Sequence, residues 1–75
     1  MRDKLETRDS LGRPVTIRVG DKIVTGITEP EAVVHTVIGF DAGLVMCRSC
    51  QGGKCWQMKW GPEEFANRLT DPATI

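Results

Sequence analysis

The chain has 75 residues, enough for one domain with a single small hydrophobic core. Ten basic residues balance ten acidic ones, so the chain has no overall positive field to draw it onto nucleic acid or an anionic membrane. Apolar residues make up 40% of the chain and charged residues 27%, which is typical of a soluble globular domain.

The sequence contains no segment typical of export or membrane insertion. The charged start of the chain is not followed by the apolar run of a signal peptide. The apolar run over residues 33–38 is interrupted by His35 and Thr36 and is too short to span a bilayer. We therefore expect a cytoplasmic protein, whose cysteines remain thiols or bind metal in preference to forming a disulfide.

The first residues carry many charges and little that could be buried. Residues 1–13 include only three apolar side chains, Met1, Leu5 and Leu11. We expect a flexible tail here, with a helix docked on the domain as the alternative. The folded domain is expected over residues 14–69, followed by a short C-terminal tail over 70–75.

Alternating apolar and polar residues predict the first strands. The alternation over residues 15–19 gives a strand with one buried face and one solvent-exposed face. The Gly20-Asp21 pair is a turn signal, after which residues 22–27 continue the alternation. Residues 28–31 form a polar loop, because their proline cannot donate to a ladder. Two short strands and a loop are therefore expected in this region.

Residues 32–38 are the part of the chain most prone to form a strand. They contain four β-branched valines and isoleucines, and apolar side chains fall on both faces. This pattern predicts a central strand that is covered on both sides. Residues 39–43, with a glycine at each end, form the next turn.

Residues 44–60 hold all three cysteines and both tryptophans, and they predict a β-hairpin. The turn falls at residues 51–54, around the Gly52-Gly53 pair. Trp56 and Trp60 lie an even number of residues apart and therefore share one face of the strand. We expect them to be core residues together or a binding platform together.

Residues 61–69 predict one short helix. Pro62 suits the first helical position, two glutamates follow at the positive end of the helix dipole, and Arg68 lies at the negative end. Phe65 and Leu69, four residues apart, should pack onto the sheet. With the five strands and their glycine-rich turns, the helix indicates a mainly β fold: a small five-stranded barrel with a C-terminal helical turn and a flexible charged N-terminus.

Several turn segments follow a pattern shared with one family of small barrels. The matching features are an early Gly-Asp pair, a Gly-Leu-Val-x-Cys strand, a Gly-Gly hairpin and a Pro-Glu-Glu segment: Gly20-Asp21, 43–47, Gly52-Gly53 and 62–64. In these residues the chain resembles the YodC-like bacterial proteins of unknown function, over roughly residues 19–69. Cys50, Cys55 and the long charged N-terminus depart from that pattern. The resemblance implies an SH3-like barrel and no particular activity.

The cysteines leave three interpretations open. Cys47, Cys50 and Cys55 could form a Cys3His zinc site with His35, since the first spacing suits a metal knuckle. A second Cys-x-x-Cys pair is missing, however, and Cys47 and Cys50 fall on opposite faces of a regular strand. Buried thiols are the simpler interpretation, and a disulfide between Cys50 and Cys55 across the turn is the third. We expect no cofactor, with zinc as the alternative.

The sequence gives little support to catalysis. His35 lies in an apolar strand, with no serine, cysteine or carboxylate close to it in sequence, so a hydrogen-bonded core or edge histidine is favoured over a general base. Phosphate-binding loops, nucleophile elbows and paired-carboxylate motifs are not found in the sequence. We expect a protein that is not an enzyme.

The 44–60 hairpin and the neighbouring 39–43 loop are the candidate binding surface. The first hypothesis is a non-catalytic interaction module that binds a protein partner, or a second copy of itself, through this hairpin. A second is a weak nucleic-acid-binding barrel that combines lysine and arginine with stacking tryptophans. A third is a zinc-stabilised structural hairpin. The candidate binding residues are Phe40, Arg48, Lys54, Trp56, Lys59 and Trp60.

Overall fold

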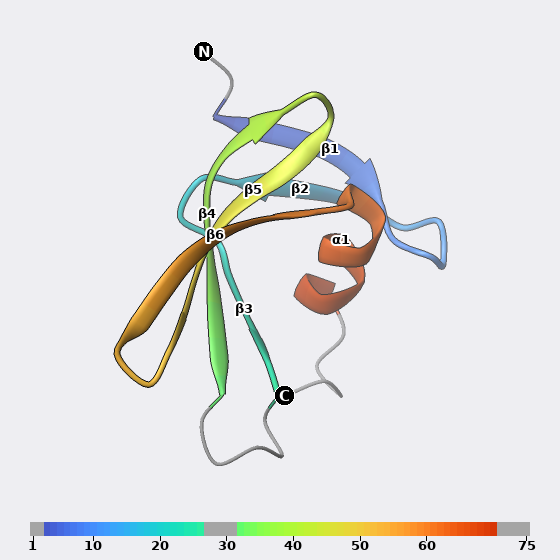
Figure 1. Cartoon of the computed structure of the whole chain (residues 1–75). Helices are drawn as coiled ribbons and strands as arrows, with labels where there is room; N and C mark the ends of the chain where they lie inside the picture. The colour runs from blue at the N-terminus through green and yellow to red at the C-terminus, as the bar shows by residue number, and fades with distance from the viewer. Residues whose placement is uncertain (1–2, 27–31, 71–75) are drawn as a thin grey trace.

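The computed structural model describes residues 3–26 and 32–70, which form six strands and one helix. The elements are β1 (Lys4–Arg8), β2 (Pro14–Arg18), β3 (Lys22–Thr25), β4 (Val33–Asp41), β5 (Leu44–Gln51), β6 (Lys54–Trp60) and α1 (Pro62–Thr70). One antiparallel sheet contains β1 and β2, and the other has the order β3-β4-β5-β6. Figure 1 shows β1 and β2 crossing the upper part of the larger sheet, with α1 below them.

The mainly β class and the short C-terminal helix are confirmed. A closed five-stranded barrel is not confirmed, because the described strands number six and fall into two sheets. The loop expected over residues 28–31 and the tail residues 71–75 lie outside the described residues.

Residues 4–8 form a paired strand, so the expectation of a flexible tail over residues 1–13 is wrong there. β1 pairs with β2 in one continuous register, from Lys4 opposite Arg18 to Arg8 opposite Pro14. Within β1 only Leu5 packs against the core. The strand is therefore held mainly by its pairing with β2 and by the loop that follows it.

Asp9 holds the loop between β1 and β2 in place. Its side chain is only 1% exposed, and its carboxylate accepts hydrogen bonds from the backbone N–H groups of Leu11 and Arg13, each at 3.0 Å. The Arg13 guanidinium donates to the same carboxylate at 2.7 Å, and the Thr70 hydroxyl of α1 donates to it at 3.2 Å. One carboxylate thus ties the first hairpin to the last turn of the helix.

We expect acidification below about pH 4 to destabilise the wild type more than the Asp9→Asn variant. Burial opposes ionisation of Asp9, but the hydrogen bonds from Arg13, Leu11 and Thr70 outweigh it, and the pKa of this carboxyl is lowered. A carboxyl with a lower pKa in the folded chain contributes stability above its unfolded pKa and loses that contribution as the pH falls through the folded pKa.

Denaturant unfolding at about pH 7 and about pH 3 measures this loss. Asp9→Asn should be less stable than wild type at the higher pH, because the amide nitrogen cannot accept the Arg13 hydrogen bond. An equal acid-induced loss in the two proteins would contradict the role given to Asp9.

The turn between β2 and β3 joins the two sheets. Gly20 has φ of 98°, which a residue with a side chain rarely adopts. Its N–H donates to the Val37 carbonyl of β4 at 2.9 Å, and the Val37 N–H donates to the Asp21 carbonyl at 2.8 Å. The predicted Gly20-Asp21 turn is therefore confirmed, and its hydrogen bonds to Val37 extend the pairing of β4 beyond Lys22, the first residue of β3.

The core lies between the two sheets and α1. Its buried apolar residues come from four strands, β2 to β5, and from the helix: Val15, Ile17, Ile23, Val37, Val45, Cys47, Phe65 and Ala66. Leu5, Phe40, Trp60 and Leu69 pack against this cluster and are partly exposed. The smaller sheet and the helix therefore cover the same side of the larger sheet.

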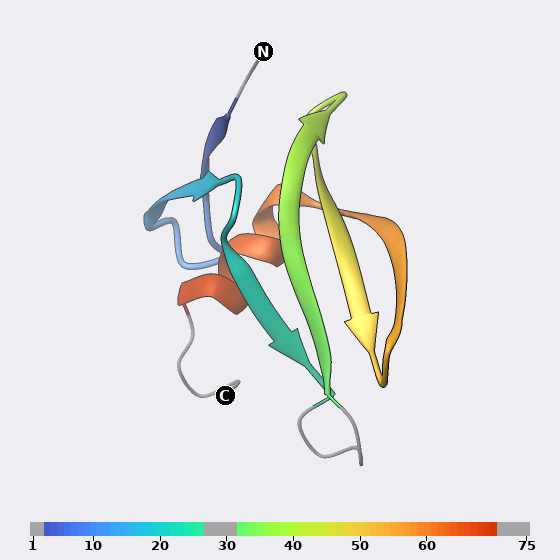
Figure 2. The same cartoon turned by 90° about the vertical axis from the view of Figure 1, so that its left-hand side faces the viewer.

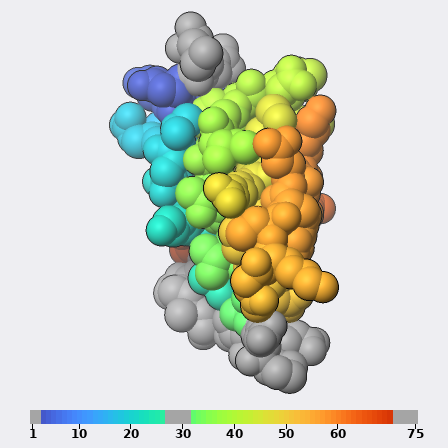
Figure 3. Space-filling model, turned by 60° about the vertical axis from the view of Figure 1, so that its left-hand side comes forward, coloured from blue at the N-terminus to red at the C-terminus, as the bar shows by residue number. Residues whose placement is uncertain are grey.

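β4 is central in the larger sheet, as predicted, but the expectation that both its faces are covered is wrong. His35 and Val37 are buried, whereas Val34 and Ile38 on the other face are exposed. Between Val37 and Gly39 the pairing with β5 shifts by one residue, as in a β-bulge. Ile38 and Gly39 therefore both lie on the outer face, and the Phe40 side chain returns to the core side. Figure 3 shows β3 to β6 side by side across this outer face.

Helix α1 begins at the predicted proline and ends one residue beyond the predicted end. Phe65 is fully buried and Leu69 packs against the core, so the predicted inward face is confirmed. The helix contacts β1, β2, β3 and β5. Within residues 3–26 and 32–70, α1 has neither the length nor the apolar character to cross a membrane.

Candidate functional site

β5 and β6 form the hairpin that the glycine pair predicts. Gly52 and Gly53 have φ of 57° and 85°, the signs that a two-residue type I′ turn requires. The pairing runs without a register shift from Gln51 opposite Lys54 to Val45 opposite Trp60. Figure 2 shows this hairpin on the side of the molecule away from β1 and β2.

The two tryptophans share the inner face of the hairpin, but the expectation that they are equally buried is wrong. Trp60 packs edge-on against His35 and Phe65, with ring centroids 5.2 and 6.3 Å apart. Trp56 lies opposite the buried Ser49 but is itself 41% exposed. The part of the hairpin that carries it projects away from α1 (Figure 1), which leaves the ring without cover on one side.

The basic side chains do not gather around the tryptophans. Arg48 and Lys59 lie on the outer face, and the Lys59 ammonium lies 3.4 Å from the Asp41 carboxylate. Lys54 is exposed on the tryptophan side, next to the turn. Phe40 lies on β4 and packs against the core. The described residues therefore do not form the single basic-aromatic surface that the nucleic-acid hypothesis requires.

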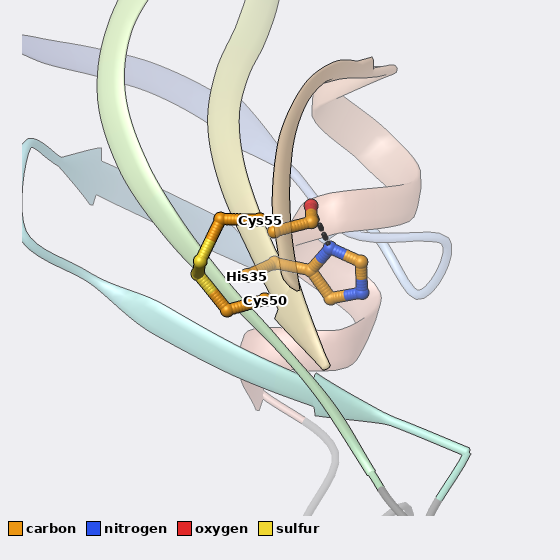
Figure 4. The surroundings of a disulfide bond; sticks show 4 residues. His35, Cys50 and Cys55 are labelled. Atoms are coloured by element: carbon orange, nitrogen blue, oxygen red, sulfur yellow. Dashed lines mark hydrogen bonds between the residues drawn. A yellow bond between two sulfur atoms is a disulfide. The ribbon is translucent and has the colours of Figure 1, made fainter. Parts of the chain in front are cut away.

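Two of the three cysteines are joined in a disulfide. Cys50 and Cys55 lie directly opposite each other on β5 and β6, with their Cα atoms 4.1 Å apart. The expectation that the cysteines stay thiols is wrong for this pair. Figure 4 shows the disulfide and the His35 ring on opposite sides of the sheet, so these candidate zinc ligands do not converge.

Cys47 is the free thiol among the described residues, and it lies in the core. Burial raises the pKa of this thiol to about 11, so it stays protonated at neutral pH and is a poor nucleophile and metal ligand. Within the described ranges, no cluster of three or more His, Cys, Asp and Glu side chains could hold a metal ion. The interpretation of Cys47 as a small buried apolar residue is confirmed.

His35 is a hydrogen-bonded core histidine, as predicted. Its Nδ1 lies 2.6 Å from the Ser49 hydroxyl, and its Nε2 lies 2.9 Å from the Thr25 hydroxyl. Burial, and after it the positive charge of Arg68, lowers the pKa of His35. The neutral ring accepts from one hydroxyl and donates to the other. Since Ser49 is fully buried, this cluster leaves a substrate no route to its hydroxyl.

The backbone of β6 has an open edge. β6 is the last strand of its sheet, so within the described part of the chain only β5 pairs with it. Residues that flank a two-residue hairpin turn form a hydrogen-bonded pair, and such pairs alternate along an antiparallel ladder. The even-numbered residues of β6 therefore hydrogen-bond to β5. The N–H and C=O groups that point to the open edge belong to Cys55, Gln57 and Lys59.

Comparison with known proteins gives no match. No family model, curated protein or solved structure matches this chain. The resemblance to the YodC-like proteins therefore stays a prediction, supported by the Gly20-Asp21 pair and the other turn segments.

Sequence reasoning identified the hairpin but did not show that its second strand is an open edge of the sheet. Side-chain alternation shows which residues share a face, whereas the edge depends on which strands pair across the whole fold. One signal was available, because residues 54–60 are followed directly by a helix, and the described residues, which end at Thr70, contain no later strand that could pair with them. Met58 was not among the candidate binding residues, although its position between the two tryptophans places it on the same face.

Proposed function

We propose that the protein is a non-catalytic interaction module that binds an extended segment of a protein partner along the open edge of β6. The observation that carries this proposal is a seven-residue edge strand with an exposed tryptophan beside backbone groups that no described strand pairs with. In strand addition, main-chain hydrogen bonds supply affinity and the alternating side chains supply specificity. β6 offers both kinds of contact.

The two kinds of contact come from alternate residues of β6. The unpaired backbone groups of Cys55, Gln57 and Lys59 can hydrogen-bond to an incoming strand. On the inner face, Trp56 and Met58 can contact the apolar side chains of that strand, and tryptophan is strongly enriched where interfaces gain most of their energy. The expected partner segment is extended and carries an apolar residue at every second position.

We also propose that the two sheets correspond to an SH3-like barrel that is open beside β6. The hydrogen bonds between the Gly20-Asp21 turn and Val37 support this proposal, because they join the smaller sheet to the larger one. The packing of α1 against strands of both sheets supports it as well. In such a barrel the opening leaves β6 available to a partner.

A random library of displayed peptides, selected on the immobilised protein, should yield ligands that bind along β6. Gln57→Pro removes the N–H in the middle of the open edge and leaves the hydrogen bonds to β5 in place. The selected peptides should bind this variant at least about tenfold more weakly. Titration of each peptide against tryptophan emission measures the affinity, since the peptide should cover Trp56.

Gln57→Ala is the matched control, because it shortens the same side chain and keeps the N–H. It should bind the selected peptides as the wild type does, and circular dichroism should show that both variants stay folded. Equal affinity of Gln57→Pro and wild type, or a library that yields no ligand, would contradict strand addition at β6.

A further inference from the structure

We propose that the open edge of β6 binds a second copy of this chain, so that two β6 strands pair antiparallel around a two-fold axis at Gln57. This inference rests on the proposed function, that the β6 edge accepts an added strand. Self-pairing of edge strands is common, and natural proteins usually block it with prolines, bulges, short strands or charges. β6 has seven residues, contains no proline and pairs with β5 without a bulge.

The backbone of β6 matches its own copy. In the register that overlaps the whole strand, Gln57 lies opposite Gln57 of the second copy, and Cys55 lies opposite Lys59. These are the residues whose N–H and C=O groups face the open edge, so each opposed pair exchanges two hydrogen bonds. The two larger sheets then become one continuous antiparallel sheet across the axis.

The side chains on the inner face match in the same register. Trp56 lies opposite Met58 of the second copy, which brings a polarisable sulfur to the exposed indole. Lys54 lies opposite Trp60 of the second copy, an arrangement that allows a cation–π contact. A two-fold axis repeats both pairs, so each copy covers the tryptophan that the other leaves exposed.

The charges are compatible with self-pairing. The chain has a formal net charge of zero, so two copies do not repel each other overall. Like charges directly opposite each other destabilise a sheet, but both lysines of β6 face uncharged residues in this register. The residue that meets its own copy is Gln57, an uncharged amide. Lys59 also has an ion-pair partner in its own chain, because the Asp41 carboxylate lies 3.4 Å from its ammonium group.

The fold leaves room for the second strand. α1 packs mainly against β1, β2, β3 and β5, and its Phe65 meets β6 through the Trp60 ring on the inner face of the sheet, which does not cover the backbone edge of β6. Figure 2 shows β6 at the far side of the molecule from β1 and β2. The neighbouring copy therefore approaches an edge that the smaller sheet does not cover.

Sedimentation velocity of the full chain, from micromolar to millimolar concentration, tests for the dimer. The wild type and Gln57→Ala should dimerise with similar dissociation constants. Gln57→Pro removes one N–H from each copy at the axis, so its dissociation constant should rise at least about tenfold. A wild type that stays monomeric at millimolar concentration would overturn the inference.

Cross-linking tests the register. In Gln57→Cys the two new cysteines lie about 5.5 Å apart between Cα atoms, within disulfide range, so mild oxidation should yield a covalent dimer. Arg48→Cys is the matched control, on the same outer face but one strand further from the axis. Its Cα atoms would be about 14 Å apart, three strand spacings, and it should not cross-link. Equal cross-linking of the two variants would overturn the proposed register.

The results separate this inference from the proposed function. Selected peptides that need the Gln57 N–H, together with a monomeric wild type, would leave strand addition standing and exclude the second copy as its occupant. A wild-type dimer that Gln57→Pro does not weaken would show that the copies meet on another surface. Either result would overturn the β6 dimer.

Discussion

The Phe65→Ala variant is expected to lose about 3–5 kcal/mol of unfolding free energy. Phe65 is fully buried, packs edge-on against Trp60, and is the largest side chain with which α1 enters the core. Truncation leaves a cavity that the surrounding strands cannot fill without moving. A domain of this length has only about 4–11 kcal/mol of stability, so the variant should be marginally folded.

Thermal unfolding followed by circular dichroism measures this effect, and the melting temperature should fall by at least about 12 °C. Glu64→Ala is the matched control, since Glu64 is the preceding residue of α1 and is exposed. It should change the melting temperature little. A similar melting temperature for Phe65→Ala and wild type would show that α1 does not stabilise the sheets.

The second large effect is expected from loss of the Cys50–Cys55 disulfide. The bond closes a short loop, with the cysteines five residues apart in sequence, and the chain-entropy relation gives about 2 kcal/mol for a loop of this size. The Cys50→Ser/Cys55→Ser variant should therefore melt about 8 °C or more below the oxidised wild type. Hydrogen exchange should rise first at the hairpin end, where the disulfide lies.

A reducing agent gives the matching experiment on the wild type. Reduction should lower its melting temperature to that of the double serine variant and should leave the variant itself unchanged. The variant keeps Cys47, so it also controls for any effect of the reductant on the free thiol. A wild-type melting temperature that does not respond to complete reduction would contradict the stabilising role of the disulfide.

The disulfide also bears on the proposed interaction. Cys55 supplies part of the open backbone edge, and its covalent link to Cys50 holds that end of β6 against β5. Strand addition is strongest to an edge that is already ordered, because less conformational entropy is lost on binding. Reduced protein should therefore bind both the selected peptides and its own copy more weakly.

Local patterns predicted the hairpin, its turn and the helix because their signals are contained within a few residues. The Gly52-Gly53 pair satisfies the positive φ angles of the turn whatever the rest of the fold does. Pro62 and the acidic residues after it mark the start of α1 in the same way. These elements depend little on distant contacts.

The first strand was missed because its stability comes from partners outside the strand itself. β1 has alternating charges and only Leu5 to place in the core, so its own sequence gives no strong strand signal. Its order depends on pairing with β2 and on the contacts that Asp9 makes with Arg13 and Thr70. Such contacts leave no periodic pattern in the sequence.

Burial at the candidate site was predicted less well than orientation. A period of two correctly placed Trp56 and Trp60 on one face, but α1 and the core reach only the second of them. In the same way, the apolar side chains of Val34 and Ile38 suggested that another element covers the outer face of β4, but no described element does so. The cysteine pairing depended on a register that the turn sets, which is why spacing alone left it open.

The contact between Asp9 and Thr70 has a consequence for how the protein forms during translation. It joins side chains 61 positions apart, and the Ser10 N–H reaches Asn67 across a similar interval, with a 2.7 Å hydrogen bond. A ribosome must therefore release nearly all of α1 before Asp9 and Ser10 of the first hairpin can form these hydrogen bonds. We expect the emerging chain to stay protease-sensitive until that late moment and then to become resistant in a single step.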